Sequence, residues 1–572
     1  MSKYLIAFLL VILPSLHIVS AQQLLNSELL GRPTDNSVTV QLQFADSIEV
    51  RVQYGTSTGN YTQQTPWVIF RDSLPAEIVI NNLQPNTQYY YRVRYRIPGD
   101  TTINNRPEYK FHTQRPVGEG FIFVVQADPH LDSQTDTAIY NRCLLNQLED
   151  EPDFMVDLGD IIMSDKLKNS ANVITEDTIV QRTEIMRGYY EKACHSVPLF
   201  IALGNHEGEA GWNLNANGNN VAVWTTLQRK KHLLNPEPDN FYSGDTTSHA
   251  YVGRRENYYT WQWGNAQFIV LDPYWYTNNK PDSLSGWDWT LGETQYLWLK
   301  QTLESSTADF KFVFAHQIIG GDPDGRGGVE FADRYEWGGN NLDGTPDFAT
   351  QRPGWYKPIK DLLTENRVTI FFHGHDHFFA QQQKDCLIYQ ECPQPGHFNF
   401  SSANQAAVYG YLQGQILPNS GHLRVRVDSS GVQVDYVRAY KAADETPTRQ
   451  NKDISATYTI GNQNCYDSLS TDIPVLWNSN YVFDTPYPNP FFSETTIEIN
   501  NSSARRITVI ITDLKGNIVR SLLSDYSVPT GKFKVVWDGK SDQGFRLAAG
   551  IYQYTIINEK NNIGSGKLVL QN

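Results

Sequence analysis

The 572-residue sequence is poor in cysteine, in long apolar runs and in positive charge. Its five cysteines are too few and too scattered for a disulfide scaffold or a cysteine-based zinc site, although Cys386 and Cys392 lie close enough to pair. After the first 21 residues, no stretch is apolar enough for a transmembrane helix. A formal net charge of −15 argues against a general basic face that binds nucleic acid. The length predicts a globular chain of about three or four domains.

The start of the chain has the pattern of an export signal. Lys3, the apolar run Tyr4–Leu16 and small residues before Gln22 are typical of a secretory signal peptide over residues 1–21. The run is too short to span a bilayer comfortably. We therefore expect the protein to be secreted or attached to the cell surface after export through the periplasm and outer membrane, without a transmembrane segment.

Five apolar stretches end in Asp, Asn or His. The stretch Val368–Phe372 runs directly into three histidines at alternate positions, which point to the same side of an extended segment. The residues at the five carboxyl ends are Asp128 and His130; Asp160; Asn205 and His206; His316; and His373, His375 and His377. In open α/β sheets these ends form the crevice that binds ligands. A metal is the simplest partner for so many imidazoles. The alternative for the three histidines that follow this strand is that one or two of them are hydrogen-bonded residues at the edge of the sheet.

In chain order these residues spell D-x-H, G-D, G-N-H-E, a lone H and G-H-x-H, which resembles the calcineurin-like metallophosphoesterase family over roughly residues 121–440. The resemblance implies a four-layer α/β/β/α sandwich that holds two metal ions. It assigns Asp128, His130, Asp160 and His377 to one ion, and Asp160, Asn205, His316 and His375 to the other. Asp160 would then bridge the ions, and His206 would be a catalytic residue that faces the leaving oxygen of the substrate.

Neighbouring residues are expected to support this site. Four of them are predicted to orient the ligand imidazoles: His373, Asp376, Asp157 and Glu207. Arg326 and Tyr335 lie in an insertion after His316 and could grip phosphate oxygens or stack on a base. The alternative for the insertion is a surface loop whose charges are simply solvated.

The sequence departs from one related family of similar architecture, the purple acid phosphatases. They have a tyrosine three residues after the bridging aspartate, where this sequence has Met163, and they lack a counterpart of His130. We therefore do not expect a ferric–tyrosinate centre. Asp, Asn and His ligands without a thiolate suit divalent or trivalent ions, so Mn, Fe and Zn all remain open.

Two β-rich segments flank the predicted catalytic domain of residues 116–440. Residues 22–115 show period-two alternation, and Leu83–Val93 resembles the tyrosine corner of a fibronectin type III domain. After a polar linker over residues 441–483, residues 484–572 resemble the C-terminal sorting domain of the type IX secretion system, which implies secretion machinery as a partner. The expected architecture is multi-domain: a metallophosphoesterase sandwich flanked by two all-β sandwiches.

The predicted function is that of a secreted dinuclear phosphohydrolase, which cleaves phosphate monoesters or diesters by attack of a hydroxide that bridges the metals. Its substrate would be a small-molecule or polymeric phosphate ester, and no nucleic-acid-binding surface is evident. An extracellular nucleotidase or phosphodiesterase of the same fold is one alternative. From another class, the chain could be a surface-displayed binding protein with a vestigial metal site, but a vestigial site should have lost a ligand.

Overall fold

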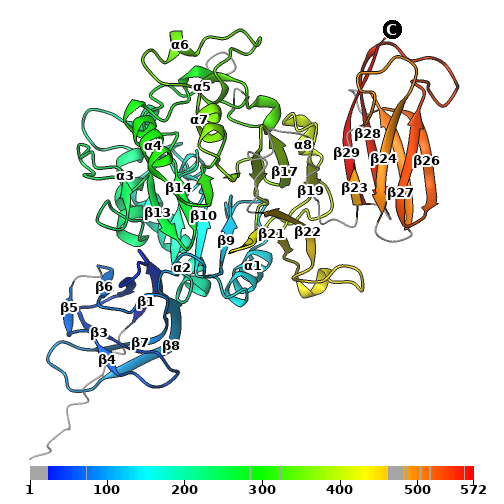
Figure 1. The fold of residues 1–572 in the computed structure, drawn as a ribbon. Helices are drawn as coiled ribbons and strands as arrows, with labels where there is room; N and C mark the ends of the chain where they lie inside the picture. The colour runs from blue at the N-terminus through cyan, green and yellow to red at the C-terminus, as the bar shows by residue number, and fades with distance from the viewer. Residues whose placement is uncertain are drawn as a thin grey trace, which may run out of the picture.

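The computed structural model describes residues 23–571, except for residues 72–73, 283–285, 323, 462–480, 484–485, 502–504, 514–516 and 559–560. An N-terminal β-sandwich, a central α/β domain and a C-terminal β-sandwich follow one another along the chain (Figure 1). The predicted signal peptide lies outside the described residues. Within the described part, no helix combines the length and apolarity needed to cross a membrane.

Two antiparallel sheets form the N-terminal sandwich. One has the order β1–β2–β6, and the other has the order β4–β3–β7–β8 with β5 beside β3. The strands are β1 (Leu24–Gly31), β2 (Val38–Phe44), β3 (Ile48–Gly55), β4 (Gln63–Gln64), β5 (Val68–Phe70), β6 (Ala76–Ile80), β7 (Gln88–Arg96) and β8 (Asn104–His112). Alternate residues of β3 are buried in the core, as the period-two pattern predicts. The hydroxyl of Tyr89 accepts a 2.9 Å hydrogen bond from the backbone N–H of Gln84, the contact expected at a tyrosine corner.

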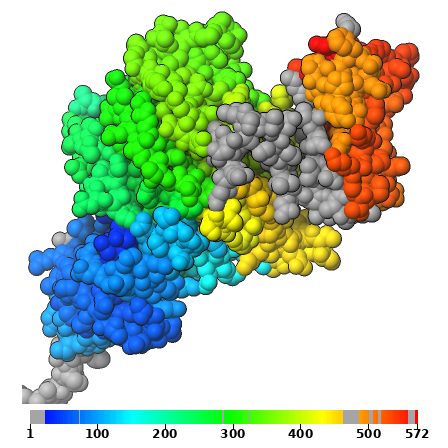
Figure 2. Space-filling view, viewed as in Figure 1, coloured from blue at the N-terminus to red at the C-terminus, as the bar shows by residue number. Residues whose placement is uncertain are grey.

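The N-terminal sandwich packs closely against the central domain, as Figure 2 shows. Its strand β1 contacts the helix α2 (Glu176–Cys194). The buried guanidinium of Arg187 on α2 donates to the backbone oxygens of Ser27, at 2.6 Å, and Gln41, at 3.2 Å. The hydroxyl of Tyr91 donates to the backbone oxygen of His195 at 2.7 Å. These buried polar contacts join the two domains through residues of both sheets of the sandwich.

The central domain is built on two mixed sheets. The six-stranded sheet has the order β11–β10–β9–β20–β21–β22, and the eight-stranded sheet has the order β12–β13–β14–β15–β16–β18–β17–β19. The strands of the first are β9 (Phe121–Gln126), β10 (Phe154–Asp157), β11 (Leu199–Ile201), β20 (Gly421–Asp428), β21 (Gly431–Arg438) and β22 (Ile454–Gly461). Those of the second are β12 (Ser243–Gly244), β13 (Tyr259–Trp263), β14 (Ala266–Val270), β15 (Phe310–Phe314), β16 (Ile370–His373), β17 (Phe379–Lys384), β18 (Leu387–Glu391) and β19 (Gln415–Leu417).

Helices cover the outer face of each sheet. The helices α1 (Thr137–Glu149) and α2 pack on the six-stranded sheet, and α4 (Glu293–Ser305) and α7 (Ile359–Glu365) pack on the eight-stranded sheet. An aromatic core that includes Phe123, Phe268 and Phe372 fills the space between the sheets. The remaining helices are α3 (Val221–His232), α5 (Tyr335–Gly338), α6 (Phe348–Gln351) and α8 (Gln405–Val408). The predicted α/β/β/α sandwich is therefore confirmed.

Parallel pairing brings the strand ends of each sheet to one edge. In the first sheet, β9, β10 and β11 run parallel, and in the second sheet β14, β15 and β16 do so. The segments that follow these strands leave from the same edge of their sheet. This edge is where the sequence placed its Asp, Asn and His residues.

The C-terminal sandwich has two antiparallel sheets, with the orders β23–β24–β27 and β26–β25–β28–β29. Its strands are β23 (Tyr481–Phe483), β24 (Thr495–Asn501), β25 (Arg505–Thr512), β26 (Ile518–Val528), β27 (Gly531–Trp537), β28 (Gly550–Asn558) and β29 (Asn561–Leu570). It buries a core of its own around Phe491, Val509 and Trp537. The predicted arrangement, with a β-sandwich on each side of the catalytic domain, is thus present.

Two sequence-based expectations differ from the structure. The strand β22 pairs with β21, so the six-stranded sheet continues to Gly461, past the predicted domain end at residue 440. The rest of the predicted linker up to residue 480 lies outside the described residues. Cys386 is disulfide-bonded whereas Cys392 is free and buried, so the suggested pairing of these two is wrong. The strand β18 separates them, and at about 3.3 Å per residue it holds their Cα atoms roughly 20 Å apart.

Candidate metal centre

The seven predicted ligands gather beyond the ends of the parallel strands. They follow β9 (Asp128 and His130), β10 (Asp160), β11 (Asn205), β15 (His316) and β16 (His375 and His377). Six of them form two groups whose ligand atoms lie within 4.8 Å of one another: Asp128, His130 and His377, and Asp160, His316 and His375. Side chains that are up to 249 positions apart in the sequence therefore meet at one place.

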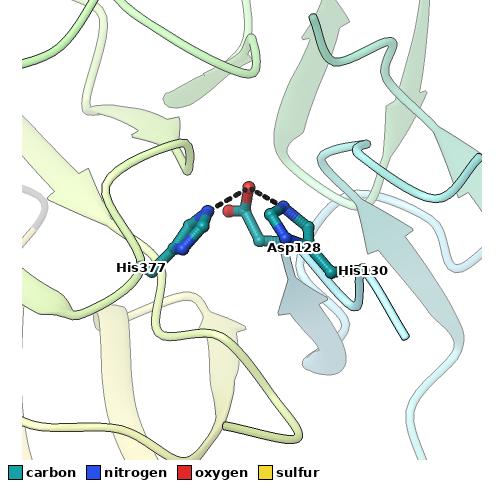
Figure 3. A group of neighbouring side chains, drawn as sticks. All are labelled: Asp128, His130 and His377. Atoms are coloured by element: carbon teal, nitrogen blue, oxygen red, sulfur yellow. Dashed lines mark ion pairs between the residues drawn. The ribbon is translucent and has the colours of Figure 1, made fainter. Parts of the chain in front are cut away.

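The first group centres on one oxygen of Asp128. Its Oδ1 lies 3.4 Å from Nε2 of His130 and 3.4 Å from Nε2 of His377. Figure 3 shows both rings pointing at this carboxylate from opposite sides. Ligands that each lie about 2.1 Å from a common ion are separated by such distances. The group is therefore arranged to hold one cation.

Asp160 reaches both groups. Its Oδ2 lies 3.2 Å from Nε2 of His316 in its own group and 3.3 Å from Nε2 of His130 in the other. A pair of ions at the usual separation of about 3.5–4 Å needs one shared carboxylate. The position of Asp160 fits that bridging role.

Five potential ligand atoms are buried and have no hydrogen-bond partner among the described residues. They are Oδ1 of Asp128, Nε2 of His130, Oδ2 of Asp160, Oδ1 of Asn205 and Nε2 of His316. More than nine in ten buried polar groups in proteins are paired, so five unpaired atoms from one motif set need a common explanation. Two cations coordinated by these atoms provide it, and the donor set therefore fits a dinuclear metal site.

Backbone carbonyls select which nitrogen of two imidazoles is free. Nδ1 of His316 donates to the backbone oxygen of Leu158 at 2.9 Å, which leaves Nε2 as the acceptor. Nε2 of His375 donates to the backbone oxygen of Asp324 at 3.1 Å, which leaves Nδ1. Burial, reinforced by Arg326, lowers the pKa of His375 well below its usual value, so the ring stays neutral. A neutral imidazole with one free lone pair is the form that binds metal.

The buried carboxylates of the site stabilise positive charge beside them. Burial alone would lower the pKa of His316, but Asp160 and Asp128 raise it to about 9. Burial alone would likewise raise the pKa of Asp128, but His316 and His377 hold it well below its usual range. Both carboxylates are fully buried, so their charges interact strongly with any neighbouring cation.

The backbone around the ligands is strained. Five ligand residues have φ values in the left-handed region: Asp128 (59°), His130 (48°), Asp160 (61°), His375 (78°) and His377 (63°). Residues other than glycine rarely adopt this conformation, which costs on the order of 1 kcal/mol or more at each position. Such strain clusters at functional sites, where it fixes side-chain direction.

Two glycines allow the carboxylates to approach the backbone. A methyl group at Gly374 would lie 2.5 Å from Oδ2 of Asp128, and one at Gly204 would overlap Oδ1 of Asp160. The backbone N–H of His375 donates to the same Asp128 oxygen at 2.9 Å. The G-H-x-H and G-N-H-E motifs therefore require glycine at these positions, because any side chain there would displace the carboxylate of Asp128 or Asp160.

Glu207 and Asp157 support the site differently from what the sequence suggested. Glu207 accepts hydrogen bonds from the backbone N–H groups of Asp160, at 2.9 Å, and Ile161, at 2.5 Å. Asp157 accepts from the hydroxyl of Tyr190 at 2.7 Å and from the backbone N–H of Gly159 at 2.9 Å. Both carboxylates thus hold the backbone of the turn that carries Asp160, whereas the predicted contacts were to ligand imidazoles.

His373 and Asp376 also bind groups other than the ligand rings. Nδ1 of His373 lies 2.7 Å from Oε2 of Glu391, the residue opposite it in the pairing of β16 with β18. Asp376 accepts from Arg326 at 3.0 Å and from the hydroxyl of Tyr411 at 2.8 Å. His373 is therefore a buried structural residue, and Asp376 anchors the arginine. Sequence reasoning missed Glu391 because only strand pairing brings it to His373.

His206 has a carboxylate partner that the sequence did not reveal. Its Nδ1 lies 2.5 Å from Oδ1 of Asp165, and its Nε2 lies 3.9 Å from Oδ2 of Asp160. Asp165 sits in a short 3-10 turn after the G-D motif, Ser164–Lys166. A single acidic residue five positions after Asp160 carries no recognisable spacing, so no pattern pointed to it.

A cavity of about 560 Å³ adjoins the ligands. Its lining includes the ligand residues Asn205 and His375, together with His206, Arg326, Trp212, Trp289, Lys166, Lys168 and Lys280. The guanidinium of Arg326 stacks on Tyr409 at 4.4 Å, so its direction is fixed. Tyr335 is buried against Trp287 and Gly286 and is not part of this lining, so the structure does not bring it to the substrate side.

Known proteins resemble the chain in two regions. Residues 121–379 match the Calcineurin-like phosphoesterase family, and residues 489–562 match the FlgD Ig-like domain. The second match identifies an Ig-like sandwich and offers no support for a type IX sorting domain. No curated protein shows significant sequence similarity to the chain.

Solved structures resemble the chain at low sequence identity, and PhoD shares its fold. PhoD is 16% identical, with a TM-score of 0.55 over 77% of this chain and 90% of its own. The purple acid phosphatase PPD1 of yellow lupin (Lupinus luteus) seeds is 15% identical, with a TM-score of 0.48 over 76% of this chain and 74% of its own. Residues 121–379 thus make up a calcineurin-like phosphoesterase domain, and the chain is a phosphoric ester hydrolase.

Proposed function

We propose that the chain is an exported, dinuclear metal-dependent phosphohydrolase that cleaves phosphate monoesters or diesters. The observation that carries the proposal is the position of Asp160 between two ligand groups whose facing atoms are buried and unpaired. Two divalent or trivalent ions, such as Mn, Fe or Zn, suit these oxygen and nitrogen ligands. When bound, they would polarise the phosphate oxygens and supply a hydroxide nucleophile near neutral pH.

The protein groups around the ions have separate tasks in this proposal. His206 presents Nε2 beside the ligands and would protonate or hydrogen-bond the leaving oxygen. Asp165 holds the ring by accepting from Nδ1. Arg326 lines the cavity and would donate to the non-bridging phosphate oxygens. No covalent enzyme intermediate is needed, because the scheme includes no side-chain nucleophile.

The cavity suggests the size and the chemical character of the alcohol that is esterified to the phosphate. Its volume of about 560 Å³ greatly exceeds that of a phosphate group and leaves room for a sizeable alcohol part. Trp212 and three lysines also line the cavity, so aromatic or anionic groups of the substrate would be favoured there. For this reason an extracellular nucleotidase or phosphodiesterase is the second candidate. The complete ligand set argues against a mere binding protein with a vestigial site.

Export is a separate part of the proposal. The apolar N-terminal stretch would direct the chain to the periplasm, and the C-terminal sandwich would be the signal read by a type IX secretion machinery. Because this sandwich has its own core, its removal should leave the catalytic domain folded. A chain that is truncated before residue 486 should therefore keep phosphatase activity but remain in the periplasm. Normal export of the truncated chain would contradict the sorting role.

The catalytic proposal is tested with p-nitrophenyl phosphate and bis-p-nitrophenyl phosphate, together with metal analysis of the purified protein. Asp160→Asn and His375→Ala should abolish turnover of both esters and reduce the bound metal. His206→Ala should keep the metal and lose rate. His249→Ala, a half-buried histidine that does not line the cavity, is the matched control and should keep both. Full activity of Asp160→Asn would overturn the proposal.

A further inference from the structure

One sheet of the N-terminal sandwich carries a cluster of arginines on its outer side. Arg51 on β3 is directly opposite Arg94 on β7 in the strand pairing, and Arg92 and Arg96 occupy the neighbouring alternate positions of β7. The intervening valines of both strands are fully buried in the sandwich core, so all four arginines lie on the face away from it. These four residues are called the arginine face below.

The two central arginines lack acidic partners. Arg92 donates to Oε1 of Gln53 at 2.9 and 3.1 Å, and Arg96 pairs with Glu49 at 2.5 Å. By contrast, Arg51 and Arg94 make no ion pair or hydrogen bond to side chains in the described part of the chain, and the Nε of each is buried and unpaired. Like charges placed directly opposite each other in a sheet are destabilising.

The positive charge is least compensated at the centre of the arginine face. Burial, and then the charges of Arg94 and Arg96, lower the pKa of Arg51. The neighbouring acids lie beside the outer arginines: Glu108 is opposite Arg92 in the strand pairing, and Asp100 interacts with Arg96. Glu108 also accepts hydrogen bonds from the hydroxyl of Tyr61 at 2.5 Å and from the backbone N–H of Gly59 at 2.7 Å. In a chain with a net charge of −15, such a local concentration of positive charge is unexpected for a purely solvated surface.

Aromatic rings hold the guanidinium groups in place. The ring of Trp67 lies 4.5 Å from Cζ of Arg51 and 4.5 Å from Cζ of Arg96, and that of Tyr61 lies 4.4 Å from Cζ of Arg92. Stacking restricts the guanidinium planes and leaves their N–H edges for hydrogen bonding. Because the rings already contact arginines, recognition by this face would depend on charge and N–H donors more than on aromatic stacking.

The central domain leaves the arginine face uncovered. The central domain contacts β1, and it also reaches the sheet of the arginines at Tyr91 and Lys110, which bind His195 and Glu151. Within the described part of the chain, the hydrogen bonds, ion pairs and ring contacts of the four arginines all stay inside the N-terminal sandwich. Arg51 and Arg94 are both partly exposed. A ligand could therefore reach the face in the intact chain.

We propose that the arginine face binds a linear phosphate polymer, with one phosphate group between Arg51 and Arg94 and more distant phosphates of the same polymer on Arg92 and Arg96. The guanidinium fork matches two phosphate oxygens. Alternate residues of a strand repeat about every 6.7 Å, whereas neighbouring phosphorus atoms of a polyphosphate are joined through one shared oxygen, so successive arginines would contact every second or third phosphate. The face would hold a polyanion on the enzyme surface. The inference does not depend on the proposed catalytic function, since no residue of the metal centre takes part.

The test uses the full chain treated with a chelator, so that hydrolysis cannot occur. Long-chain polyphosphate, pyrophosphate and inorganic phosphate are titrated in parallel by calorimetry at about 50 and 200 mM salt. We expect polyphosphate to bind, with an affinity that falls steeply with salt. The double variant Arg51→Gln/Arg94→Gln should bind at least about tenfold more weakly and show a flatter salt dependence, because two phosphate contacts are lost.

Two further variants separate this site from general charge and from misfolding. Arg254→Gln removes an exposed arginine outside the arginine face and should bind polyphosphate like the wild type. Arg94→Lys keeps the charge but loses the fork, and should be intermediate. Unchanged thermal unfolding of the double variant would show that it is folded. Equal binding by the double variant and the wild type would overturn the proposal. So would inorganic phosphate binding as tightly as the polymer, or a sulfated polysaccharide of equal charge binding more tightly.

Discussion

Nδ1 of His206 lies 2.5 Å from Oδ1 of Asp165, and the opposite ring nitrogen lies 3.9 Å from Oδ2 of Asp160. A carboxylate on Nδ1 fixes the ring direction and the tautomer, which leaves Nε2 on the side of the metal ligands. The side chain of His206 is 21% exposed, so this nitrogen remains accessible from the cavity. Asp165 is thus a positioning residue for His206.

The first prediction concerns this pair. Asp165→Asn should keep bound metal but reduce kcat by about 10- to 100-fold for alkyl phosphates, whose leaving groups need a proton, since general acid catalysis contributes about 10²–10⁴-fold. The loss should be much smaller for p-nitrophenyl phosphate. In a His206→Ala background the same substitution should have little further effect. Equal losses for good and poor leaving groups, or additive losses in the double variant, would contradict the positioning role.

The ligand set could be predicted from sequence because each ligand follows a buried strand. Strand ends of a parallel sheet share an edge, which is enough to place Asp128 near Asp160 on the first sheet and His316 near His375 on the second. That these two edges meet follows from the packing of the two sheets. The match to a family pattern then divided the residues between two ions. Burial, tautomers and the strained φ values follow from the folded structure alone.

What could not be predicted depends on contacts between distant segments. Glu391 reaches His373 only through the pairing of β18 with β16, and Asp165 reaches His206 through the arrangement of two turns. Tyr335 lies in a loop after His316, but its ring packs against Gly286, which no local pattern reveals. The strand β22 was hidden in a polar segment because it is a sheet edge with several exposed residues.

The second prediction concerns metal removal. The five unpaired ligand atoms, with two buried carboxylates among them, should destabilise the metal-free domain. Adding Mn²⁺ or Zn²⁺ to chelated protein should raise the midpoint of thermal unfolding, with a stabilisation of about 2.7 kcal/mol when the ion reaches 100 times its Kd. Calorimetry of the wild type and Asp160→Asn measures this shift. A similar shift in both proteins would mean that the ion binds elsewhere.

The third prediction concerns Gly374. A methyl group there would lie 2.5 Å from Oδ2 of Asp128 and 2.6 Å from Cβ of Ala127, so Gly374→Ala should displace the carboxylate. We expect at least a tenfold loss of metal affinity and a destabilisation of about 1–3 kcal/mol. Gly188 in α2 is the matched control, because a methyl group meets nothing within 4 Å there and alanine favours a helix. Metal titration and thermal unfolding of both variants test this prediction, and equal metal affinity in the two variants would contradict it.

The fourth prediction concerns a buried charge network behind the G-N-H-E turn. Glu209 binds Arg229 at 2.6 Å and Arg255 at 2.9 Å, and Arg255 continues to Asp272 at 2.7 Å. All four side chains are buried. Burial alone would raise the pKa of Glu209, but the two arginines lower it to about 2.

This lowered pKa makes stability depend on acid pH. In the unfolded chain the pKa of glutamate is about 4.3, so the stabilisation from Glu209 is complete above that pH and is lost as the pH falls towards 2. The difference corresponds to roughly 3 kcal/mol. Glu209→Gln should be less stable than the wild type at neutral pH, because it leaves two buried guanidinium groups without a charged partner. Its unfolding temperature should also fall less steeply than that of the wild type below about pH 4. Calorimetry of both proteins across this range provides the comparison, and parallel pH profiles would assign the acid sensitivity to other carboxylates.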